Sequence, residues 1–263
     1  ARYRQEKGKT PLLALEVLDS KTERSAIFSL LVMGALGPAV NFLIPLYIQI
    51  VQGRTTMQTS IAVVPYTLAI FASAVLIVRL YKYLTPRLIG SIGFIIVAVG
   101  LTILAFTIGN DWGTPMVILG LVVLGLGEGS LLTLLFNVMV SSSPKELAGD
   151  VGALRGTANN LSTALGTAFS SVVAVSLLSL LIMSNVTNNP ALPPALQAQV
   201  PLDNINFVSN DQLQATMAAT NATPEQVAEA KRINEEARLR SLKAAFIILA
   251  AYGLYLVFSL AKD

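Results

Sequence analysis

The sequence contains no cysteine and no histidine among its 263 residues. Without cysteine there are no disulfide bonds and no thiolate metal ligands, and without histidine there are no imidazole ligands. Nucleophilic pairs of the Ser-His or Cys-His kind are excluded for the same reason. With no clustered carboxylates within the apolar runs either, we expect no enzymatic activity. No metal and no cofactor are expected. Any proton that this protein carries must be held by a carboxylate.

Charged residues are scarce, at 13 % of the chain against roughly 25 % in soluble domains, and hydrophobic residues make up 54 %. A soluble protein of this length could not cover its surface with so few charges, so lipid must solvate much of the chain. The net charge is +3, but the charges lie between apolar runs and not along one face. This pattern argues against a nucleic-acid partner and makes the lipid bilayer the expected one.

Long stretches without charge divide the chain into six segments, each able to cross a membrane as a helix of about 20 residues. The segment 112–144 contains one acidic residue, Glu128, and a further charge-free run begins at Gly156. The expected fold class is an all-α polytopic membrane protein with six transmembrane helices and a long helical outer loop. We expect these helices at about 25–51, 58–80, 88–109, 115–140, 153–184 and 242–261.

The basic residues predict the orientation, because Lys and Arg concentrate on the cytoplasmic side. Six of them lie in the leading segment 1–24, whereas the two short loops on the opposite side hold only Arg54. Both ends are therefore expected in the cytoplasm of a multi-pass cell-membrane protein. The expected division is a cytoplasmic lead-in, five transmembrane helices, an extracytoplasmic loop, and the sixth helix with a cytoplasmic end: 1–24, 25–183, 184–241 and 242–263. The chain opens with Ala1 and not with Met, which suggests a piece of a longer protein.

The long loop 184–241 contains two helix-start signals. Ser209 is followed three residues later by Gln212, and Thr223 by Gln226, which is the capping-box spacing. We therefore expect two short helices here, the second running on through Glu236 into the last span. The loop is interpreted as a solvated outer cap without a ligand role.

Glu128 is the main candidate for chemistry. It lies near the middle of the fourth expected span, where a carboxylate costs roughly 2.5–3.5 kcal/mol on insertion scales. Such a residue is expected to face the bundle interior or a water-filled cavity, where burial favours the neutral carboxyl. We interpret Glu128 as a proton-coupling residue. The alternative is a permanently protonated side chain that hydrogen-bonds a neighbouring helix.

Other polar and small residues within the spans are candidates for lining or packing. Asn41, close to Pro38, is expected either to line a substrate cavity or to bond a neighbouring helix, and Gln49 and Asn137 are further cavity candidates. Small residues allow two helices to approach closely. The expected packing positions are Gly125, Gly129, Gly152, Gly156 and Gly166.

Arg155 is expected to anchor at the cytoplasmic interface, with a gating contact to Asp150 or Glu146 as the alternative. Six aromatic residues lie mostly near the ends of the expected spans, as interfacial side chains do. They are Tyr47, Tyr66, Tyr81, Tyr83, Trp112 and Tyr255.

Three stretches resemble the fourteen-helix drug:proton antiporter branch of the major facilitator superfamily. Pro45-Leu46-Tyr47-Ile48-Gln49 is similar to the phrase that ends the first helix of the carboxyl half. The stretch 149–155, followed by Leu165-Gly166-Thr167-Ala168, and the lead-in 11–15 are similar to segments in the same order. In the loop between the second and third spans Arg87 fits the family pattern. Lys82, Tyr83 and Thr85 stand where Asp, Arg and Gly are common, so the resemblance does not extend to a charge-relay gate in this loop.

The resemblance implies a two-half bundle with its substrate site between the halves. This chain would then be the carboxyl half, and six or eight amino-terminal helices would be its partner. The implied function is proton-gradient-driven efflux of amphipathic or cationic small molecules across a bacterial inner membrane. Two alternatives stay open: export of a specific metabolite or siderophore, and a membrane subunit or scaffold that does not transport.

Overall fold

The computed structural model describes residues 31, 34–110, 115–141, 148–187, 189, 206–218 and 222–262. Nearly all of these residues are helical, and there is no strand among them. Five helices are long and apolar enough to cross a membrane, and a shorter apolar helical segment covers Leu36–Val51. The prediction of an all-α polytopic membrane protein is confirmed. The predicted start of the first span, 25–30, lies outside the described residues.

The first apolar segment changes its helix type along its length. Helix α3 (Leu36–Leu46) contains Pro45 and passes directly into the π-helical segment η2 (Tyr47–Val51). Proline removes one helical N–H donor, and π-helical turns are frequent at functional sites. The Gln52 N–H donates to the Tyr47 carbonyl at 3.2 Å and closes the segment.

The second expected span is kinked. It consists of α4 (Thr56–Ala62) and α5 (Val64–Leu80), which meet at Val63, two residues before Pro65. A proline in the first turn of α5 explains the break, because its nitrogen cannot continue the hydrogen-bond pattern of α4. Helix α4 begins at a capping box in which Thr55 and Gln58 bond each other's backbone.

Helix α7 (Pro115–Ser141) packs against both α5 and α6 (Pro86–Thr107). Glycines make the close approach between α6 and α7 possible. A Cβ atom at Gly100 would lie 2.6 Å from the Leu124 backbone nitrogen, and one at Gly127 would lie 2.6 Å from that of Val97. These three helices form the tightest part of the bundle.

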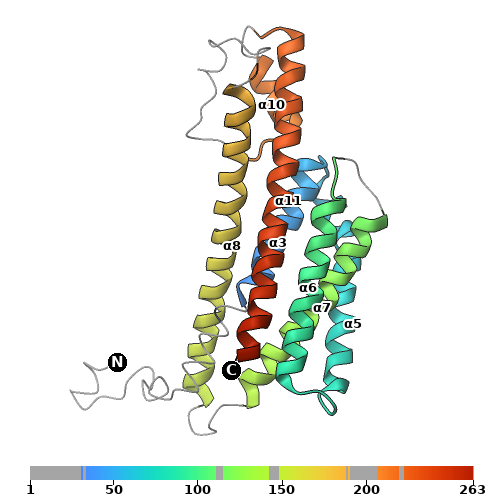
Figure 1. The fold of residues 1–263 in the computed structure, drawn as a ribbon, viewed down its shortest axis with the longest axis vertical. Helices are drawn as coiled ribbons and strands as arrows, with labels where there is room; N and C mark the ends of the chain where they lie inside the picture. Colours follow the sequence, from blue (N-terminus) through green and yellow to red (C-terminus); the bar gives the residue numbers. More distant parts are fainter. Residues whose placement is uncertain are drawn as a thin grey trace, which may run out of the picture.

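The two longest helices, α8 (Ala148–Thr187) and α11 (Pro224–Lys262), lie side by side and extend beyond the others (Figure 1). Helix α11 also packs on α6, and α8 packs on α3. The short α10 (Asn210–Ala218) lies beside the projecting part of α11, and we call this the α10 end of the bundle. Both predicted helices of the loop are confirmed, and the second runs unbroken into the last span. Residues 190–205 of the loop lie outside the described part.

Both predicted capping boxes are present. The Ser209 hydroxyl accepts from the Gln212 N–H at 3.2 Å while the Gln212 side chain accepts from the Ser209 N–H at 3.1 Å. Thr223 and Gln226 make the equivalent pair at the start of α11. These reciprocal bonds satisfy backbone donors that the first helical turn leaves without partners.

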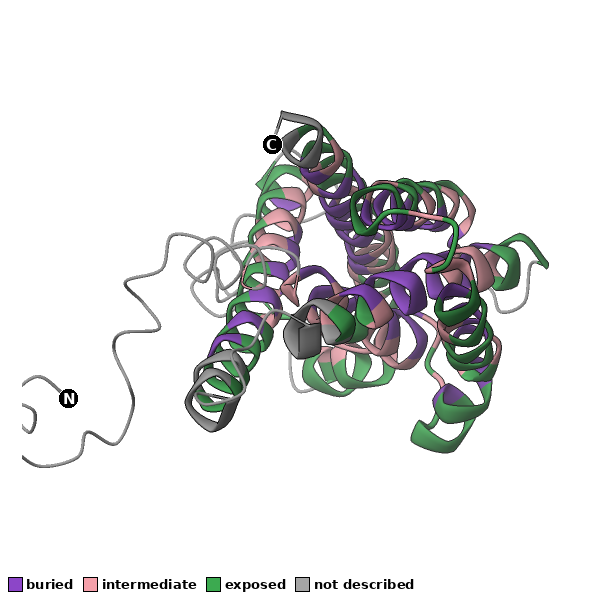
Figure 2. Cartoon of the chain, turned by 90° about the horizontal axis from the view of Figure 1, so that it is seen from below, coloured by how far each residue is buried: buried purple, intermediate pink, exposed green. Residues whose placement is uncertain are grey.

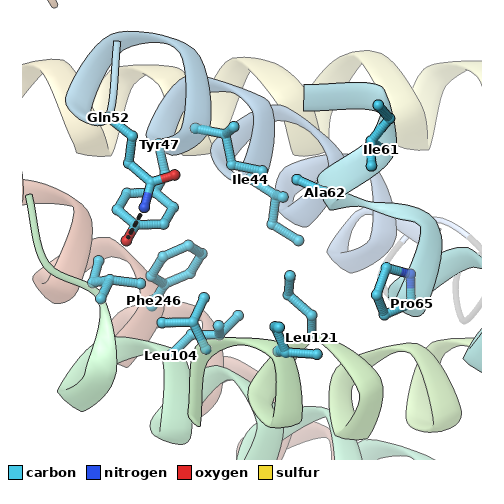
Figure 3. A pocket seen from close by; sticks show the side chains of 13 residues that line it. Ile44, Tyr47, Gln52, Ile61, Ala62, Pro65, Leu104, Leu121 and Phe246 are labelled. Carbon is cyan, nitrogen blue, oxygen red and sulfur yellow. Dashed lines mark hydrogen bonds between the residues drawn. The ribbon is translucent and has the colours of Figure 1, made fainter. Parts of the chain in front are cut away.

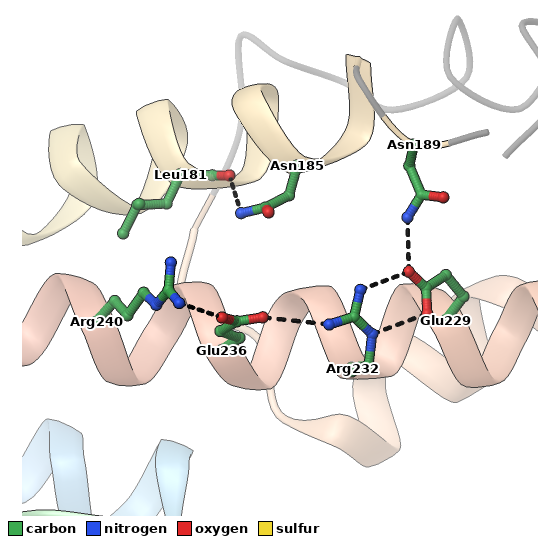
Figure 4. Close-up of polar contacts among 7 residues, drawn as sticks. All are labelled: Leu181, Asn185, Asn189, Glu229, Arg232, Glu236 and Arg240. Atoms are coloured by element: carbon green, nitrogen blue, oxygen red, sulfur yellow. Dashed lines mark hydrogen bonds and ion pairs between the residues drawn. The ribbon is translucent and has the colours of Figure 1, made fainter. Parts of the chain in front are cut away.

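The charged part of α11 is held by ion pairs along one face (Figure 4). Arg232 bonds Glu229 at 2.7 Å and Glu236 at 3.3 Å, and Arg240 bonds Glu236 at 2.5 Å. The Asn189 amide, just beyond the end of α8, donates to Glu229 at 2.6 Å and joins the two long helices.

Buried residues face the centre of the bundle and exposed ones its outside (Figure 2). Many exposed side chains are large and apolar, among them Leu68, Phe71, Phe106 and Phe169. Water would not solvate such a surface favourably, whereas lipid does. The outside of the bundle is therefore suited to a membrane.

Candidate functional site

Glu128 lies within α7 with only 7 % of its surface exposed. Its neighbours in the helix are small, which brings the adjacent helices close to it. A Cβ atom at Gly125 would collide with the Tyr66 carbonyl, and one at Gly129 with the Ile70 carbonyl, so both glycines lie against α5. The carboxylate is thus held in a crowded interior, where an unpaired charge would be costly.

Two polar side chains contact this carboxyl group, and we call the three residues the Glu128 cluster. The Tyr66 hydroxyl on α5 lies within hydrogen-bonding distance of Glu128 Oε2, and the Asn41 amide on α3 donates to Glu128 Oε1 at 3.4 Å. The Tyr66 hydroxyl also lies 3.2 Å from Asn41 Oδ1. Three helices that are far apart in sequence therefore each contribute one member.

Gly37 makes room for the carboxyl group on α3. A Cβ atom there would lie 2.6 Å from Glu128 Oε1, which is closer than a real Cβ contact allows. Any larger residue at this position would displace the carboxyl group from Asn41. No pattern in the sequence points to this role of Gly37, because the role depends on how α3 is rotated against α7.

The Glu128 cluster borders a cavity of about 230 Å³. Polar groups from α3 and α8 reach it, namely Asn41, Asn159 and Thr163, together with Glu128 from α7. Apolar side chains such as Val97 and Leu131 complete the wall. A mostly apolar cavity with a few converging polar groups is the usual form of a small-molecule site.

Chemically, this arrangement can hold a proton at the cavity wall. A neutral carboxyl group has an O–H donor, whereas the ionised group only accepts, and both forms find partners in the tyrosine hydroxyl and the asparagine amide. Among the described residues that line the cavity, Glu128 is the only charged one. The site therefore has one group whose charge can change.

A second cavity of about 160 Å³ lies between η2, α5, α6, α7 and α11 (Figure 3). Its wall is almost entirely apolar, with Ile44, Leu104, Leu121 and Phe246 among its side chains. The Tyr47 hydroxyl at its edge donates to the Gly109 carbonyl at 2.9 Å and accepts from the Gln52 amide. This cavity offers shape but no titratable carboxylate, so the first cavity is the candidate site.

The other predicted cavity and gate residues are not gathered at Glu128. Gln49 is half-buried in η2, and Asn137 is exposed further along α7; neither lines the cavity beside Glu128. Arg87 is exposed in the first turn of α6. Asp150 and Arg155 belong to α8, but their side chains lie outside the described set, as does Glu146.

The predicted packing glycines on α8 divide into two groups. A Cβ atom at Gly166 would collide with the Ala35 carbonyl, so α3 and α8 meet closely there. At Gly152 and Gly156 no heavy atom of the described residues lies within 4 Å of such a Cβ atom. The described residues therefore do not make the expected close packing at Gly152 and Gly156. This end of α8 lies away from the other described helices.

Tyr66 was predicted to lie at the membrane interface, and its position in the structure corrects this. It is 4 % exposed and belongs to the Glu128 cluster. Its depth in the expected span 58–80 was a usable signal, because eight residues at 1.5 Å each place it about 12 Å from the span's start. Tyr47 is also buried, at 4 % exposure.

Arg238 is a second buried polar residue that the sequence did not single out. Its side chain is fully enclosed, and it donates to the Ile50 carbonyl at 3.0 Å, the Val208 carbonyl at 2.7 Å and Asn210 Oδ1 at 2.7 Å. These acceptors lie in η2, in the segment before α10, and at the start of α10. The α10 end is therefore joined to the transmembrane part by a buried guanidinium, which corrects the interpretation of a simply solvated cap.

Comparison with known proteins gives the family. The family profile of the Major Facilitator Superfamily matches residues 3–167, more than half of the chain. A tetracycline resistance determinant of Streptomyces rimosus is 30 % identical over 162 residues, which cover 54 % of this chain and 45 % of that protein.

Two further relatives have similar levels of identity. The multidrug efflux pump LfrA of Mycolicibacterium smegmatis is 28 % identical over 63 % of this chain and 32 % of its own length. The uncharacterized transporter YebQ of Escherichia coli is 28 % identical over 48 % of this chain and 27 % of its own length. The chain spans less than half the length of each of these relatives. With six apolar helical segments and a family profile that matches most of them, the chain belongs to the major facilitator superfamily, a family of multi-pass membrane transporters.

Proposed function

We propose that this chain is the carboxyl-terminal half of a proton-coupled exporter of small amphipathic or cationic molecules, and that Glu128 carries the transported proton. The observation on which this rests is the Glu128 cluster. Glu128, a residue that is 7 % exposed, has a hydroxyl and an amide as partners of its carboxyl group and lies at the wall of a cavity. Buried ionisable groups within membrane helices mark proton and substrate pathways.

The proposal of a half protein is supported by the coverage of the relatives. The matched parts are 45 %, 27 % and 32 % of their lengths. Six or eight further helices at the amino-terminal side would then form the opposite wall of the cavity, and transport would proceed by rocking of one half against the other. Asn41 is left exposed by the described residues of this chain, and in this arrangement it would face the other half.

The proposed location is a bacterial inner membrane with both ends of this chain in the cytoplasm and the α10 end outside. It is supported by the basic residues of the segment 1–24 and of the connection between α5 and α6. The proton gradient would be the energy source, without a bound cofactor. At the cytoplasmic end we propose Arg87, Asp150 and Arg155 as interface or gate residues.

The test is transport by everted membrane vesicles that contain the protein in its natural full length. Uptake of a fluorescent cationic dye is measured with and without an imposed pH gradient, for the wild type and for Glu128→Gln. Gln keeps the size and the hydrogen-bonding capacity but cannot ionise. We expect gradient-driven uptake in the wild type and its loss in Glu128→Gln, with dye binding retained.

Glu236→Gln is the matched control, because it removes a half-buried carboxylate that lies in the ion-pair row of α11 and not at the cavity. It should transport like the wild type. Gradient-driven uptake that survives in Glu128→Gln would return Glu128 to a packing role. Absence of transport across a broad panel of compounds would favour a narrow metabolite or siderophore substrate, or a scaffold that does not transport.

A further inference from the structure

The Tyr66 hydroxyl lies between two acceptors but carries only one proton. It is within hydrogen-bonding distance of Glu128 Oε2 and 3.2 Å from Asn41 Oδ1. It can therefore donate to one of them at a time. The Asn41 amide nitrogen lies 3.4 Å from the other carboxyl oxygen, Oε1, and completes the cluster. The direction of these bonds must depend on whether the carboxyl group is protonated.

When Glu128 is ionised, both of its oxygens accept. The Tyr66 O–H donates to Oε2 and the Asn41 amide donates to Oε1, because hydrogen bonds to a charged acceptor are stronger than neutral ones. Asn41 Oδ1 then receives no proton from Tyr66. Since Asn41 is exposed and lines the cavity, this oxygen can accept a hydrogen bond from a molecule there.

When the carboxylate takes up a proton that arrives in the cavity as hydronium and leaves a water molecule behind, it becomes a donor. Its new O–H donates to the Tyr66 oxygen, and the Tyr66 O–H turns toward Asn41 Oδ1, 3.2 Å away. The bond between Tyr66 and Oε2 thereby reverses its direction, the bond from the Asn41 amide to Oε1 is kept, and the new carboxyl O–H is the only covalent bond formed. Asn41 Oδ1 is now occupied from within the protein, and a donor group in the cavity loses its acceptor.

We propose that Tyr66 and Asn41 are positioning residues that transmit the protonation state of Glu128 to the cavity, which accepts a small molecule with an N–H or O–H donor when Glu128 is ionised. This rests on the proposed function, since Glu128 must take up the transported proton. The proposal also specifies the substrate further, because the cavity would select a hydrogen-bond donor in addition to a positive charge.

Among the described residues, Tyr66 is the titratable side chain that contacts Glu128. Helix α3 presents Asn41 and Gly37, and α6 presents Val97. Helix α8 brings the uncharged Asn159 and Thr163 to the same cavity. The polar contacts of the carboxyl group within the described part are thus those of the cluster itself.

Two cationic probes separate this relay from simple attraction by the charge of Glu128. Ethidium is an aromatic cation with N–H donors, and tetraphenylphosphonium is a cation without any donor. Dissociation constants are measured by calorimetry on the purified full-length protein at two pH values. The infrared band of the protonated carboxyl group, identified by its absence in Glu128→Gln, shows that these values bracket its titration.

In the wild type we expect acidification to weaken ethidium binding roughly five- to tenfold more than tetraphenylphosphonium binding, the worth of about one hydrogen bond. In Tyr66→Phe, and separately in Asn41→Leu, this excess should vanish while tetraphenylphosphonium keeps its pH dependence. The carboxyl band should also shift in Tyr66→Phe, because its O–H loses the tyrosine oxygen as acceptor. Tyr81→Phe is the matched control: its buried hydroxyl has no hydrogen-bond partner among the described residues, and the excess should persist.

An equal pH effect on both probes in the wild type, or an ethidium excess that survives in Tyr66→Phe, would overturn the relay. If Tyr66→Phe fails to fold, Asn41→Leu decides with the same readout. Failure of both probes to bind would overturn the proposed substrate chemistry. The proposed function fails on a different result, namely gradient-driven transport that survives in Glu128→Gln.

Discussion

Replacement of Arg238 by methionine is expected to detach the α10 end from the transmembrane helices. Methionine fills most of the same volume but removes every donor. The Ile50 carbonyl and Asn210 Oδ1 would lose the donor that Arg238 supplies, whereas the Val208 carbonyl keeps the Asn234 amide at 3.2 Å. The substitution therefore leaves two part-buried acceptors without this partner.

The expected magnitude follows from these contacts. A buried polar group left without its partner costs about 1–3 kcal/mol, so these two part-buried acceptors together give a loss of at most about 6 kcal/mol. Removing the guanidinium offsets part of this, since burying a charge is itself unfavourable and no carboxylate forms an ion pair with Arg238 among the described residues. We expect a net loss of about 2–4 kcal/mol in the free energy of opening this end.

The assay is amide hydrogen exchange of the full-length protein in lipid nanodiscs, followed in peptides that cover residues 206–218. At about 1.4 kcal/mol per factor of ten, the expected loss corresponds to roughly 30- to 700-fold faster exchange. Arg232→Met is the control, because Arg232 lies on the same helix and forms ion pairs, but its side chain is 61 % exposed. Exposed ion pairs contribute little, so exchange should change little there. Unaltered exchange in Arg238→Met, or an equal increase in both variants, would refute the reasoning.

Two further predictions concern glycines. In Gly129→Ala the new methyl group would collide with the Ile70 carbonyl, which should lower the free energy of unfolding by about 1–3 kcal/mol. In Gly156→Ala the methyl group meets open space, so the free energy of unfolding should stay the same or rise by up to about 1 kcal/mol. Equal melting temperatures for the two variants would contradict the packing of α7 on α5. In Gly37→Ala the carboxyl group of Glu128 is displaced from Asn41, so vesicles should lose gradient-driven dye uptake at normal expression level; wild-type uptake would show that the contact is dispensable.

Local signals in the sequence located the helices well. The capping boxes at Ser209 and Thr223 begin α10 and α11 where predicted, because a cap depends on residues three positions apart. The apolar runs similarly predicted the spans, since their length is set by the thickness of a bilayer. The kink before Pro65 was not predicted, although the proline that causes it was visible.

The candidate site was only partly predictable. Glu128 and Asn41 were chosen as a carboxylate and an amide within apolar runs, and their contact at 3.4 Å joins residues 87 positions apart. Tyr66 was assigned to the interface and Arg238 was not chosen at all. Nothing within one helix tells which face of another helix it meets.

The sequence by itself determined that this is a helical membrane protein, that Glu128 lies deep within a span, and that the last loop contains two capped helices. Composition and spacing along one chain are sufficient for these statements, because the bilayer and the helix backbone impose them locally. Only the tertiary structure decided which side chains surround the carboxyl group and which glycines meet another backbone. Those outcomes depend on the rotation and register of helices packed against one another, where a shift of one residue turns a side chain by about 100° around the helix axis.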